Sequence, residues 1–334
     1  MASVDVIIVN WNAGKQLREC LAALSESIQT GYTISSVIVV DNASVDGSDA
    51  NLDFPLLPLR LIRNAGNRGF AAACNQGVDA SQADYFLFLN PDSRVNKTTL
   101  GNSIRFMEEK ENARVGICGV QLVDKAGTVA CSCAHFLRSR YFIYAMLGLN
   151  RLFPTVCPDL VYPEKAHLQS HQVEHVIGAY FFVRSSLFKD LAGFDERFFV
   201  YYEDVDFSFR AYKAGWSSYY LADTRCYHAG GGTSAQVKAK RLFYSLRSRT
   251  LYGFKHFRLS NAFFLLAATL LMEPISRLLL ALFSGSLTQA QETLVAYWLF
   301  GKSIPGLFSN PYLTSTGLVK QELTDGASIQ IHLS

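Results

Sequence analysis

Short apolar runs that end in polar residues recur along the first part of the chain. Four such runs lie at residues 6–9, 37–40, 59–62 and 85–89, and the run at 85–89 has five apolar residues without internal alternation. Runs of this kind are typical of strands that are buried on both faces of a sheet. Segments with helical spacing or helix-forming composition separate them. The pattern therefore predicts an α/β fold whose first part is a doubly wound parallel sheet.

The segments between the runs predict further elements. Leu17, Leu21 and Leu24 recur at the spacing of a helix face. Residues 43–48 have the composition of a turn and a helix cap, and they predict a short helix before the third strand. Residues 66–75 form a glycine-punctuated loop that runs into an alanine-rich helix.

Polar side chains follow three of the four predicted strands. Asn10 and Asn12 follow the first strand, Asp41 follows the second, and Asn90 and Asp92 follow the fourth. In open α/β sheets, ligands bind at the carboxyl ends of the strands. Taken alone, the Asn-Pro-Asp sequence at 90–92 fits an ordinary strand-ending turn equally well. Three polar strand ends on one edge of the sheet predict a site.

Beyond residue 115 the pattern is less regular. Apolar runs cover residues 115–123 and 173–183, and we interpret the aperiodic segment 131–172 as a variable loop region. The elements expected after it are a helix that ends at Gly215, a strand over 219–222 and a flexible glycine loop over 227–233.

The C-terminal part combines a basic stretch with apolar helices. No acidic residue occurs between Asp223 and Glu273, and the basic residues there include Lys238, Lys240, Arg241, Arg247, Arg249, Lys255 and Arg258. The apolar segments 262–272 and 275–283 are interrupted by Glu273-Pro274, whereas a spanning helix needs about 20 apolar residues. A basic segment followed by a broken apolar pair predicts an anchor at a membrane surface. Helices packed on the main domain or on a second subunit are the alternative. A closing strand is expected over 329–331.

Composition narrows the class of protein. The 334 residues are 49% hydrophobic and 18% charged, which allows a large core. The net charge of +3 is too small for a nucleic-acid footprint, so no nucleic-acid partner is expected.

The seven cysteines form no Cys-x-x-Cys pair, which argues against a zinc site or a disulfide framework. The N-terminus has no basic region or cleavage site, so we expect no signal peptide and a cytoplasmic location.

A set of short motifs occurs in a characteristic order. They are Val-Ile-Ile-Val-Asn-Trp-Asn at 6–12, Val-Val-Asp-Asn-Ala-Ser at 39–44, Asn-Arg-Gly-Phe-Ala-Ala-Ala-Cys-Asn at 67–75, Asn-Pro-Asp at 90–92, Gly-Ala at 178–179, Glu-Asp-Val-Asp at 203–206, and His228. The ordered set resembles the family-2 glycosyltransferases of GT-A fold, and especially the rhamnosyltransferase-like branch that builds bacterial cell-surface polysaccharides. The resemblance covers about residues 4–260.

The resemblance implies a fold and a domain organisation. It implies an α/β GT-A fold, Rossmann-like, with a mixed sheet flanked by helices and a C-terminal helical extension. We expect a catalytic domain over 1–235, with a nucleotide-binding half over about 1–95 and an acceptor half over about 96–235. A basic and apolar helical segment over 236–309 and a tail over 310–334 would follow.

The resemblance assigns the donor site to the first half of the chain. Val9, Asn10, Asn12 and Asp41 are implied to line the nucleotide, and Asp41 would bond the pyrimidine or its ribose, because a carboxylate accepts from imide N–H or hydroxyl groups. The alternative for Asp41 is a cap on the following turn. The remaining donor residues implied are Asn67, Arg68, Gly69, Asn75 and Asn90.

Two of these residues have a stated physical role. Gly69 would allow a close backbone approach or a positive φ, and the helix after it would face negative charge. Arg68 could reach a phosphate. An ordinary helix start with glycine punctuation is the alternative interpretation.

The resemblance also implies a divalent metal at the diphosphate. Asp92 would offer a hard oxygen ligand to Mg²⁺ or Mn²⁺, and His228 would complete the site. Because one ligand is then an imidazole, Mn²⁺ is slightly favoured over Mg²⁺. Asn90 replaces the first acid of the Asp-x-Asp pattern of the family, which puts tight metal binding in doubt. Read alone, His228 would be a surface loop residue.

By resemblance, Asp204 is the general base. Glu203, Asp204 and Asp206 crowd three acids into four residues, so repulsion should raise the pKa of at least one of them. The preference of helix N-termini for acidic residues is the alternative explanation. Asp206 and Arg210 are spaced i, i+4 and are expected to pair. Gly178 and Ala179, with Glu203, Asp206 and Arg210, are placed on the acceptor side or in support of it.

The implied activity is inverting, metal-assisted sugar transfer. The expected donor is dTDP-rhamnose, with a UDP-hexose as second choice. The expected acceptor is a saccharide or a lipid-diphosphate-linked saccharide at the cytoplasmic face of the membrane, where the enzyme would be peripheral. The Gln-x-x-Arg-Trp motif of processive synthases is absent, so one or a few sugars would be added. A homo-oligomer is left open.

Three other classes of protein are alternatives to a glycosyltransferase. A nicotinamide-dependent oxidoreductase would carry Gly-x-Gly-x-x-Gly after the first strand, and it is missing. A sugar nucleotidyltransferase would need a glycine-rich, lysine-containing loop there, which residues 10–15 match poorly. An inactive nucleotide-sugar-binding module stays open, although the retention of Asp92, Asp204 and His228 argues against it.

Overall fold

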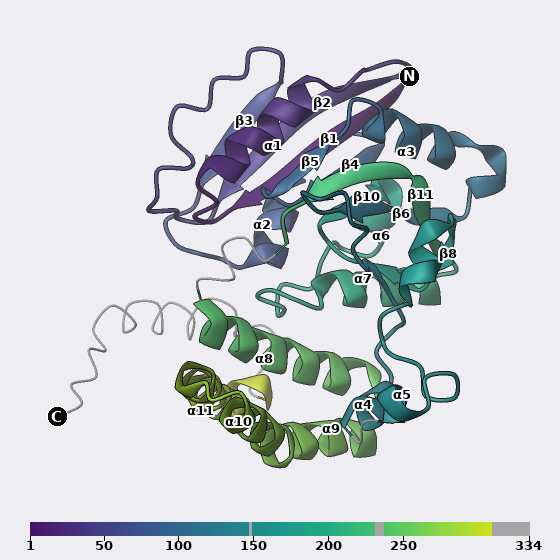
Figure 1. The fold of residues 1–334 in the computed structure, drawn as a ribbon. Helices are drawn as coiled ribbons and strands as arrows, with labels where there is room; N and C mark the ends of the chain where they lie inside the picture. Colours follow the sequence, from purple (N-terminus) through teal and green to yellow (C-terminus); the bar gives the residue numbers. More distant parts are fainter. Residues whose placement is uncertain (147–148, 231–236, 309–334) are drawn as a thin grey trace.

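The centre of the protein is a mixed sheet that lies between two layers of helices. A computed structural model describes residues 1–146, 149–230 and 237–308 (Figure 1). The strands of the sheet are β1 (Ala2–Asn10), β2 (Tyr32–Asp41), β3 (Leu59–Arg63), β4 (Tyr85–Leu89), β5 (Ser93–Val95), β6 (Val115–Val123), β8 (His171–Val173), β10 (Tyr180–Arg184) and β11 (Ser217–His228). A separate pair consists of β7 (Cys133–Ala134) and β9 (His175–Val176).

The strand order separates a parallel half from a mixed half. It runs β3-β2-β1-β4-β10-β6-β11-β5, and β8 pairs with β11. The first four strands are mutually parallel, whereas β10 is antiparallel to both β4 and β6. β11 then runs parallel to β6 and antiparallel to β5 and β8. The prediction of a parallel first part inside a mixed GT-A sheet is confirmed.

Helices cover both faces of the sheet. One face packs on α1 (Lys15–Ser25) and α3 (Thr99–Glu108), and the other packs on α2 (Phe70–Gly77), α6 (Ser185–Asp190) and α7 (Glu203–Lys213). Along β1, Val6 and Ile8 join the first core and Ile7 and Val9 join the second. Successive side chains of a strand point to opposite faces, so a strand covered on both sides must be apolar throughout. The four apolar runs are therefore strands, as predicted.

Four helices follow the sheet within the described C-terminal residues, and they lie below it in Figure 1. They are α8 (Lys238–His256), α9 (Leu259–Leu271), α10 (Glu273–Phe283) and α11 (Leu287–Phe308). Leu251 and Tyr252 of α8 form a core cluster with Leu137 and Phe198, which precede α8 in the chain. The remaining short helices are α4 (Ser139–Met146), α5 (Leu149–Leu152), η1 (Lys110–Asn112) and η2 (Glu164–Leu168).

Several predictions of local structure are wrong. No helix follows residues 43–48, because Asp41 and Asp46 accept backbone N–H groups of Ser44 and Ser48 and hold the segment in turns. The segment 131–172 holds β7, α4, α5 and η2 and reaches β8. β11 extends from Ser217 to His228, so His228 ends a strand and does not sit in a loop. The expected strand at 329–331 and the glycines at 231–232 lie outside the described residues.

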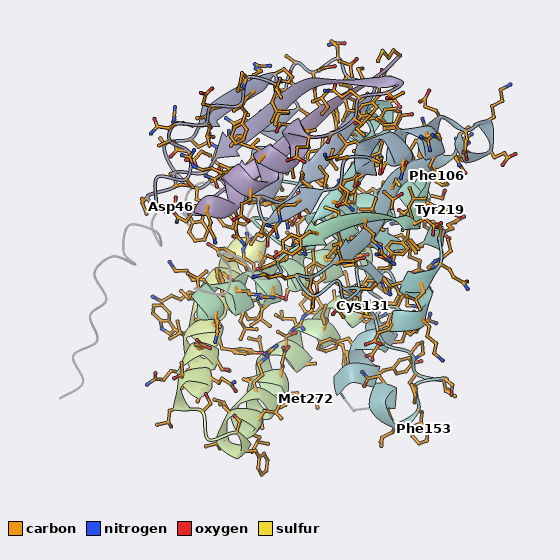
Figure 2. All side chains as sticks on the ribbon, turned by 45° about the horizontal axis from the view of Figure 1, so that its top comes forward. Asp46, Phe106, Cys131, Phe153, Tyr219 and Met272 are labelled. Carbon is orange, nitrogen blue, oxygen red and sulfur yellow. The ribbon has the colours of Figure 1, made fainter. Side chains whose placement is uncertain are left out.

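The helices α9 and α10 carry the longest apolar stretch. By length and composition alone, Leu259–Phe283 is one stretch of the described residues that could cross a membrane. It has 25 residues, and its most apolar segment of 18 residues has a mean hydropathy of 1.7 and is 17% buried. The helical run is interrupted at Met272, where α9 ends and α10 begins. Figure 2 shows Met272 among these helices, apart from the sheet-covering residues Phe106 and Tyr219.

Candidate active site

The carboxyl ends of β1 and β2 are joined by a buried polar cluster. The Asn10 side-chain amide donates to Asp41 Oδ1 at 2.7 Å, to Ser48 Oγ at 2.8 Å and to Ser44 Oγ at 3.1 Å. Asn10 is fully buried and its Oδ1 has no partner among the described residues. Asp41 is 3% exposed, and its Oδ2 accepts the Ser44 N–H at 3.0 Å. The structure therefore shows the turn-capping role of Asp41, and its predicted contact with a nucleotide stays a prediction.

Asn12 closes the same edge from the loop after β1. Its Oδ1 accepts the Val45 N–H at 2.8 Å, and its own N–H donates to Ser44 Oγ at 2.9 Å. Asn12 and Ala43 have φ of 52° and 61°, in the left-handed region that non-glycine residues seldom adopt. Such backbone conformations concentrate where the surrounding structure holds them for function. Val9, 8% exposed, packs beneath this edge.

The loop before α2 is tied to the second half of the chain. Gly69 has φ of 88°, as predicted, and a Cβ there would lie 2.5 Å from the Phe199 carbonyl oxygen. The N–H of Phe70 donates to that same oxygen at 2.6 Å. The close approach that Gly69 permits is thus to Phe199, which uses the first N–H of α2. Asn67 Oδ1 accepts the Gly69 N–H at 2.9 Å, and Arg68 is exposed.

Asn75 is bonded to the second half of the chain. Its amide donates to the Phe194 carbonyl at 2.8 Å and accepts the Phe194 N–H at 2.9 Å, and it also donates to Glu196 at 3.1 Å. Both ends of the amide are occupied by the protein itself. Asn75 therefore joins α2 to the loop before α7, and its predicted contact with the donor stays a prediction.

Asp92 and His228 meet at the junction of β5 and β11. His228 Nε2 lies 3.4 Å from Asp92 Oδ1, with 15% and 10% of their side chains exposed. Ala229 donates its N–H to the Asp92 carbonyl at 3.1 Å, and His228 pairs with Ser93 across the two strands. The two residues, which are far apart in the sequence, are thus brought together as predicted.

These two side chains fit a divalent ion as a partial ligand set. The 3.4 Å between them is a separation compatible with two ligands of one ion at about 2.1 Å each. Among the described residues, no group of three or more His, Cys, Asp and Glu is arranged so that it could hold a metal ion by itself. A metal held here would need further oxygen ligands from a diphosphate and water.

The dipeptide Gly178-Ala179 lies between two acidic centres. The Ala179 carbonyl accepts the N–H of Asn90 at 3.1 Å and the hydroxyl of Ser93 at 3.3 Å, which tethers the turn that carries Asp92. The Gly178 N–H donates to Asp204 Oδ2 at 2.8 Å. A Cβ at Gly178 would lie 3.3 Å from that oxygen. The turn of residues 90–92 and the side chain of Asp204 are therefore linked through two adjacent residues.

Asp204 sits near the start of α7 in a set orientation. Its Oδ1 accepts the Val205 N–H at 2.8 Å, and 15% of its side chain is exposed. The two residues before the helix, Tyr201 and Tyr202, have φ of 68° and 70°. Left-handed conformations of non-glycine residues cost of order 1 kcal/mol or more each. The backbone thus turns sharply into α7 and presents Asp204 at its first turn.

The pKa of Glu203 is raised well above its ordinary value. Burial is the main cause, and the negative charges of Asp204 and Asp206 add to it. Glu203 is 5% exposed, and its Oε2 has no hydrogen-bond partner among the described residues. The prediction that crowding raises one pKa is confirmed in direction, with desolvation as the larger effect.

Asp206 supports α7 from inside. It is fully buried and contacts Arg210 at 2.8 Å, Lys255 at 2.6 Å and His256 at 2.7 Å. Burial opposes ionisation, but the His256 hydrogen bond and the charges of Arg210 and Lys255 outweigh it and lower the pKa of Asp206. The expected pair with Arg210 is confirmed. Because Lys255 and His256 end α8, the C-terminal helices hold the acidic helix in place.

The sequence reasoning missed several of these residues. His175, Lys255 and His256 contact the acids of α7, and Ser208 of the same helix contacts His175. None of the four was predicted. Ser208 lies one turn after Asp204, a spacing that could have revealed it. His175 is the polar residue at the start of the apolar segment 173–183, and nothing local marks its partner.

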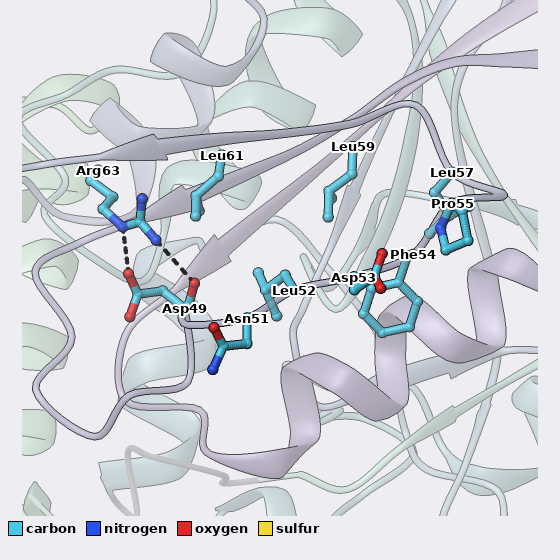
Figure 3. Close-up of a pocket in the computed structure, with 10 residues that line it drawn as sticks. All are labelled: Asp49, Asn51, Leu52, Asp53, Phe54, Pro55, Leu57, Leu59, Leu61 and Arg63. Atoms are coloured by element: carbon cyan, nitrogen blue, oxygen red, sulfur yellow. Dashed lines mark hydrogen bonds and ion pairs between the residues drawn. The ribbon is translucent and has the colours of Figure 1, made fainter.

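A separate cavity lies at the edge strand β3, under the loop 49–57. It has a volume of about 420 Å³, and Figure 3 shows the Arg63 side chain paired with Asp49 at one end of it. Leu52, Leu59 and Leu61 at its wall also pack against the first core. None of the candidate site residues lines this cavity. It is a gap between loop and sheet, distinct from the candidate active site.

Comparison with known proteins places the chain in context. A family model described as "Glycosyl transferase family 2" matches residues 5–191. The N-acetylglucosaminyl-diphospho-decaprenol L-rhamnosyltransferase of Mycobacterium tuberculosis is 27% identical over 252 residues, which are 72% of this chain and 80% of that protein. Rhamnosyltransferase WbbL of Escherichia coli is 28% identical over 180 residues, 53% of this chain and 64% of that protein.

Among solved structures, a mannosyltransferase from Pyrobaculum calidifontis in complex with GDP-Man and Mn²⁺ is similar in fold. The TM-score is 0.52 at 18% identity, and the match covers 92% of this chain and 87% of the other. At this identity the likeness shows the fold alone.

Proposed function

The chain belongs to glycosyl transferase family 2, and from this premise we propose that it transfers rhamnose, with inversion, from dTDP-rhamnose to a saccharide or lipid-diphosphate-linked saccharide. It is a glycosyltransferase of GT-A fold and of the rhamnosyltransferase-like branch. The observation that carries the proposal is the pair of acidic centres, Asp92 and Asp204, on either side of Gly178-Ala179.

The relatives support the choice of donor and acceptor. The mycobacterial relative is named for L-rhamnosyl transfer to an N-acetylglucosaminyl-diphospho-decaprenol, and it aligns over most of both chains. An acceptor of that kind presents a sugar hydroxyl next to a lipid diphosphate. A UDP-hexose is the second candidate donor, because another relative is named only as a hexosyltransferase.

Asp204 would act as the general base. Its carboxylate takes the proton of the acceptor hydroxyl while that oxygen bonds to the anomeric carbon, and the bond to the diphosphate breaks with its electron pair leaving on the diphosphate. A single displacement of this kind inverts the anomeric centre. Asp204 accepts two backbone N–H groups, from Gly178 and Val205, which hold its carboxylate in place.

Asp92 and His228 would hold Mg²⁺ or Mn²⁺ at the donor diphosphate. The contact between them and their low exposure support this assignment. The presence of Mn²⁺ in the complex of the Pyrobaculum calidifontis enzyme supports the class of ion. When bound, such an ion would neutralise charge on the departing diphosphate. Asn10, Asn12 and Asp41, whose side chains gather at the ends of β1 and β2, would form the base and ribose pocket.

The helices α9 to α11 would rest on the inner face of the cytoplasmic membrane. Their large exposed apolar residues are Leu259, Phe263, Phe264, Leu271, Met272, Ile275, Leu279, Leu280, Leu282, Phe283, Leu287, Leu294, Val295 and Trp298. Glu273 of α10 is turned toward the protein, where it pairs with Arg249 and Arg277. An exposed apolar surface beside basic residues suits an interfacial contact, and a second copy of the chain is the competing occupant.

A transfer assay tests the proposed activity. Purified protein is incubated with dTDP-rhamnose, UDP-hexose or GDP-mannose and a synthetic GlcNAc-diphospho-polyprenol, with and without Mn²⁺. We expect rhamnosyl transfer, and Asp204→Asn should abolish it while dTDP binding persists. Transfer from a UDP-hexose alone would move the donor to the second choice. Binding of nucleoside diphosphates without any turnover would favour the inactive module.

Membrane association is tested with anionic phospholipid vesicles. We expect Leu280→Glu with Phe283→Glu to abolish cosedimentation, because both side chains are exposed at 66% and 87%. Leu56→Glu, 76% exposed in the loop before β3, is the matched control and should bind normally. Unchanged vesicle binding by the double variant contradicts the assignment, and its conversion from dimer to monomer would identify a subunit interface instead.

A further inference from the structure

A buried histidine bridges two positions of the helix that carries Asp204. His175, in β9, is 3% exposed in its side chain, and its Nε2 lies 3.7 Å from Asp204 Oδ2. Its Nδ1 lies 3.2 Å from Ser208 Oγ. Asp204 and Ser208 are four residues apart in α7, so they share one face of the helix. The imidazole thus spans one helical turn, with the carboxylate at one end and the hydroxyl at the other.

The chemistry of the two neighbours determines the tautomer of this imidazole. An ionised carboxylate only accepts hydrogen bonds, so the nitrogen that faces it, Nε2, carries the proton. Nδ1 is then an acceptor, and Ser208 donates its hydroxyl proton to it. Burial lowers the pKa of His175, and the opposing charge of Asp204 does not reverse this. His175 is therefore neutral at neutral pH, with its N–H dipole directed at Asp204.

The second buried histidine of the same half of the protein is arranged in the opposite way. His167 Nε2 accepts the backbone N–H groups of Ser132 at 3.0 Å and Cys133 at 2.9 Å, so its proton must lie on Nδ1, which donates to the Pro163 carbonyl at 3.2 Å. All three of these hydrogen bonds of the ring are with backbone groups. His167 makes the backbone hydrogen bonds expected of a structural histidine, whereas His175 faces the side chains of Asp204 and Ser208.

The effect of the imidazole falls on the orientation of Asp204. The distance of 3.7 Å exceeds a hydrogen bond and leaves no room for an intervening water, and contacts of this kind often shorten when substrate binds. Among the described residues, Glu203 and Tyr202 also interact electrostatically with Asp204, and both lie beside it in the chain. His175 approaches it from a different element.

We propose that His175 is a positioning residue for Asp204: supported by Ser208, it fixes the orientation of this carboxylate for proton abstraction. The inference rests on the proposed function, because it takes Asp204 as the general base. It adds to that function a residue that never touches the acceptor and acts only through Asp204.

The test is a kinetic series on the intact enzyme. We expect His175→Ala to lower kcat about tenfold with an unchanged KM for the donor, less than the loss of a general base, which is typically worth about 10²–10⁴. His175→Gln keeps an N–H donor near the position of Nε2 and should restore most of the rate. Ser208→Ala should lower kcat by a smaller amount.

His167→Gln is the matched control for the loss of a buried imidazole. It should lower the melting temperature and leave kcat unchanged. An unchanged kcat in folded His175→Ala, or a His175→Gln variant as slow as His175→Ala, overturns the proposal. Substantial transfer by Asp204→Asn would refute the base assignment itself.

A readout independent of activity is the tautomer state seen by ¹⁵N NMR of the histidine side chains. We expect His175 as the Nε2–H form and His167 as the Nδ1–H form at neutral pH, each assigned by the signals lost in its Gln variant. An Nδ1–H form of His175 overturns the proposal even if the variants are inactive.

Discussion

The N–H of Gly178 donates to Asp204 Oδ2 at 2.8 Å. This backbone hydrogen bond holds the carboxylate that we assign as the general base. The next residue, Ala179, accepts from Asn90 and Ser93 on the opposite side. One dipeptide therefore fixes the relative position of the base and of the turn that carries Asp92. Small changes here should affect activity more than stability.

Gly178→Ala tests this relationship. The added Cβ would lie 3.3 Å from Asp204 Oδ2, which is the movable end of a side chain, so the fold can accommodate it while the carboxylate shifts. We expect a fall in kcat of about tenfold, since small misplacements of reacting groups are costly, with a melting temperature close to that of the wild type. Gly101→Ala, whose Cβ would meet Tyr32 at an ordinary 3.5 Å, should leave kcat unchanged. Equal rates in both variants would contradict the role of Gly178.

Gly69→Ala should instead destabilise the fold. Its Cβ would lie 2.5 Å from the carbonyl oxygen of Phe199, which is backbone and cannot rotate away, and its φ is 88°. We expect a loss of about 3 kcal/mol or more in the free energy of unfolding, measured by urea denaturation. Gly66→Ala, where the added atom meets open space, serves as the control and should cost little. A stable Gly69→Ala protein would show that the contact with Phe199 is absent in solution.

Glu203→Gln should stabilise the protein at neutral and alkaline pH. Burial, with the charges of Asp204 and Asp206, raises the pKa of Glu203 from its ordinary 4.5. The folded protein then holds this proton when the unfolded chain has lost it, so stability falls as pH rises above about 4.5 until the folded pKa is passed. The amide removes that loss and should gain about 1–3 kcal/mol at pH 8 and almost nothing at pH 4.

The measurement for Glu203 is the melting temperature as a function of pH. Glu111→Gln, at an exposed position of η1, provides the control and should show no pH-dependent difference. A Glu203→Gln variant that is less stable than the wild type at pH 8 would mean that the carboxylate is satisfied in solution.

Lys255→Met should loosen α7. Lys255 contacts both Asp195 and the fully buried Asp206 at 2.6 Å, and removal of one partner leaves buried charge uncompensated. We expect a loss of about 3–5 kcal/mol in the free energy of unfolding, together with reduced kcat. Lys238→Met, exposed in the first turn of the same helix, should be neutral. An equally small effect of both substitutions would remove Lys255 from the support of α7.

Asp92→Asn should abolish the effect of metal on nucleotide affinity. If Asp92 and His228 hold the ion, Mn²⁺ strengthens dTDP binding to the wild type and EDTA reverses it, whereas the variant binds dTDP with the same weak affinity in both conditions. Calorimetric titration with and without Mn²⁺ measures this. Asp79→Asn, exposed after α2, is the control and should keep the metal dependence. A metal dependence retained in Asp92→Asn would place the ion elsewhere.

The sequence by itself determined the parallel half of the sheet, because a strand that is buried on both faces leaves a continuous apolar run, as at residues 6–9, 37–40 and 85–89. The run at residues 85–89 coincides with β4, and the turn at 90–92 follows it. The ordered motifs determined the family and most of the candidate residues. They did not show the partners of those residues within the protein, such as Phe194, which bonds Asn75.

Only the tertiary structure decided which distant groups meet. His175 reaches Asp204 because β9 packs on α7, and Gly69 meets Phe199 across two halves of the chain. Lys255 reaches Asp206 from α8, which lies beyond the residues that the family model matches. Such pairs leave no local signal, because hydrophobic periodicity records whether a position is buried and not which side chain lies opposite. The desolvation that raises the pKa of Glu203 has the same origin, since it comes from atoms packed around the residue and not from its neighbours in the chain.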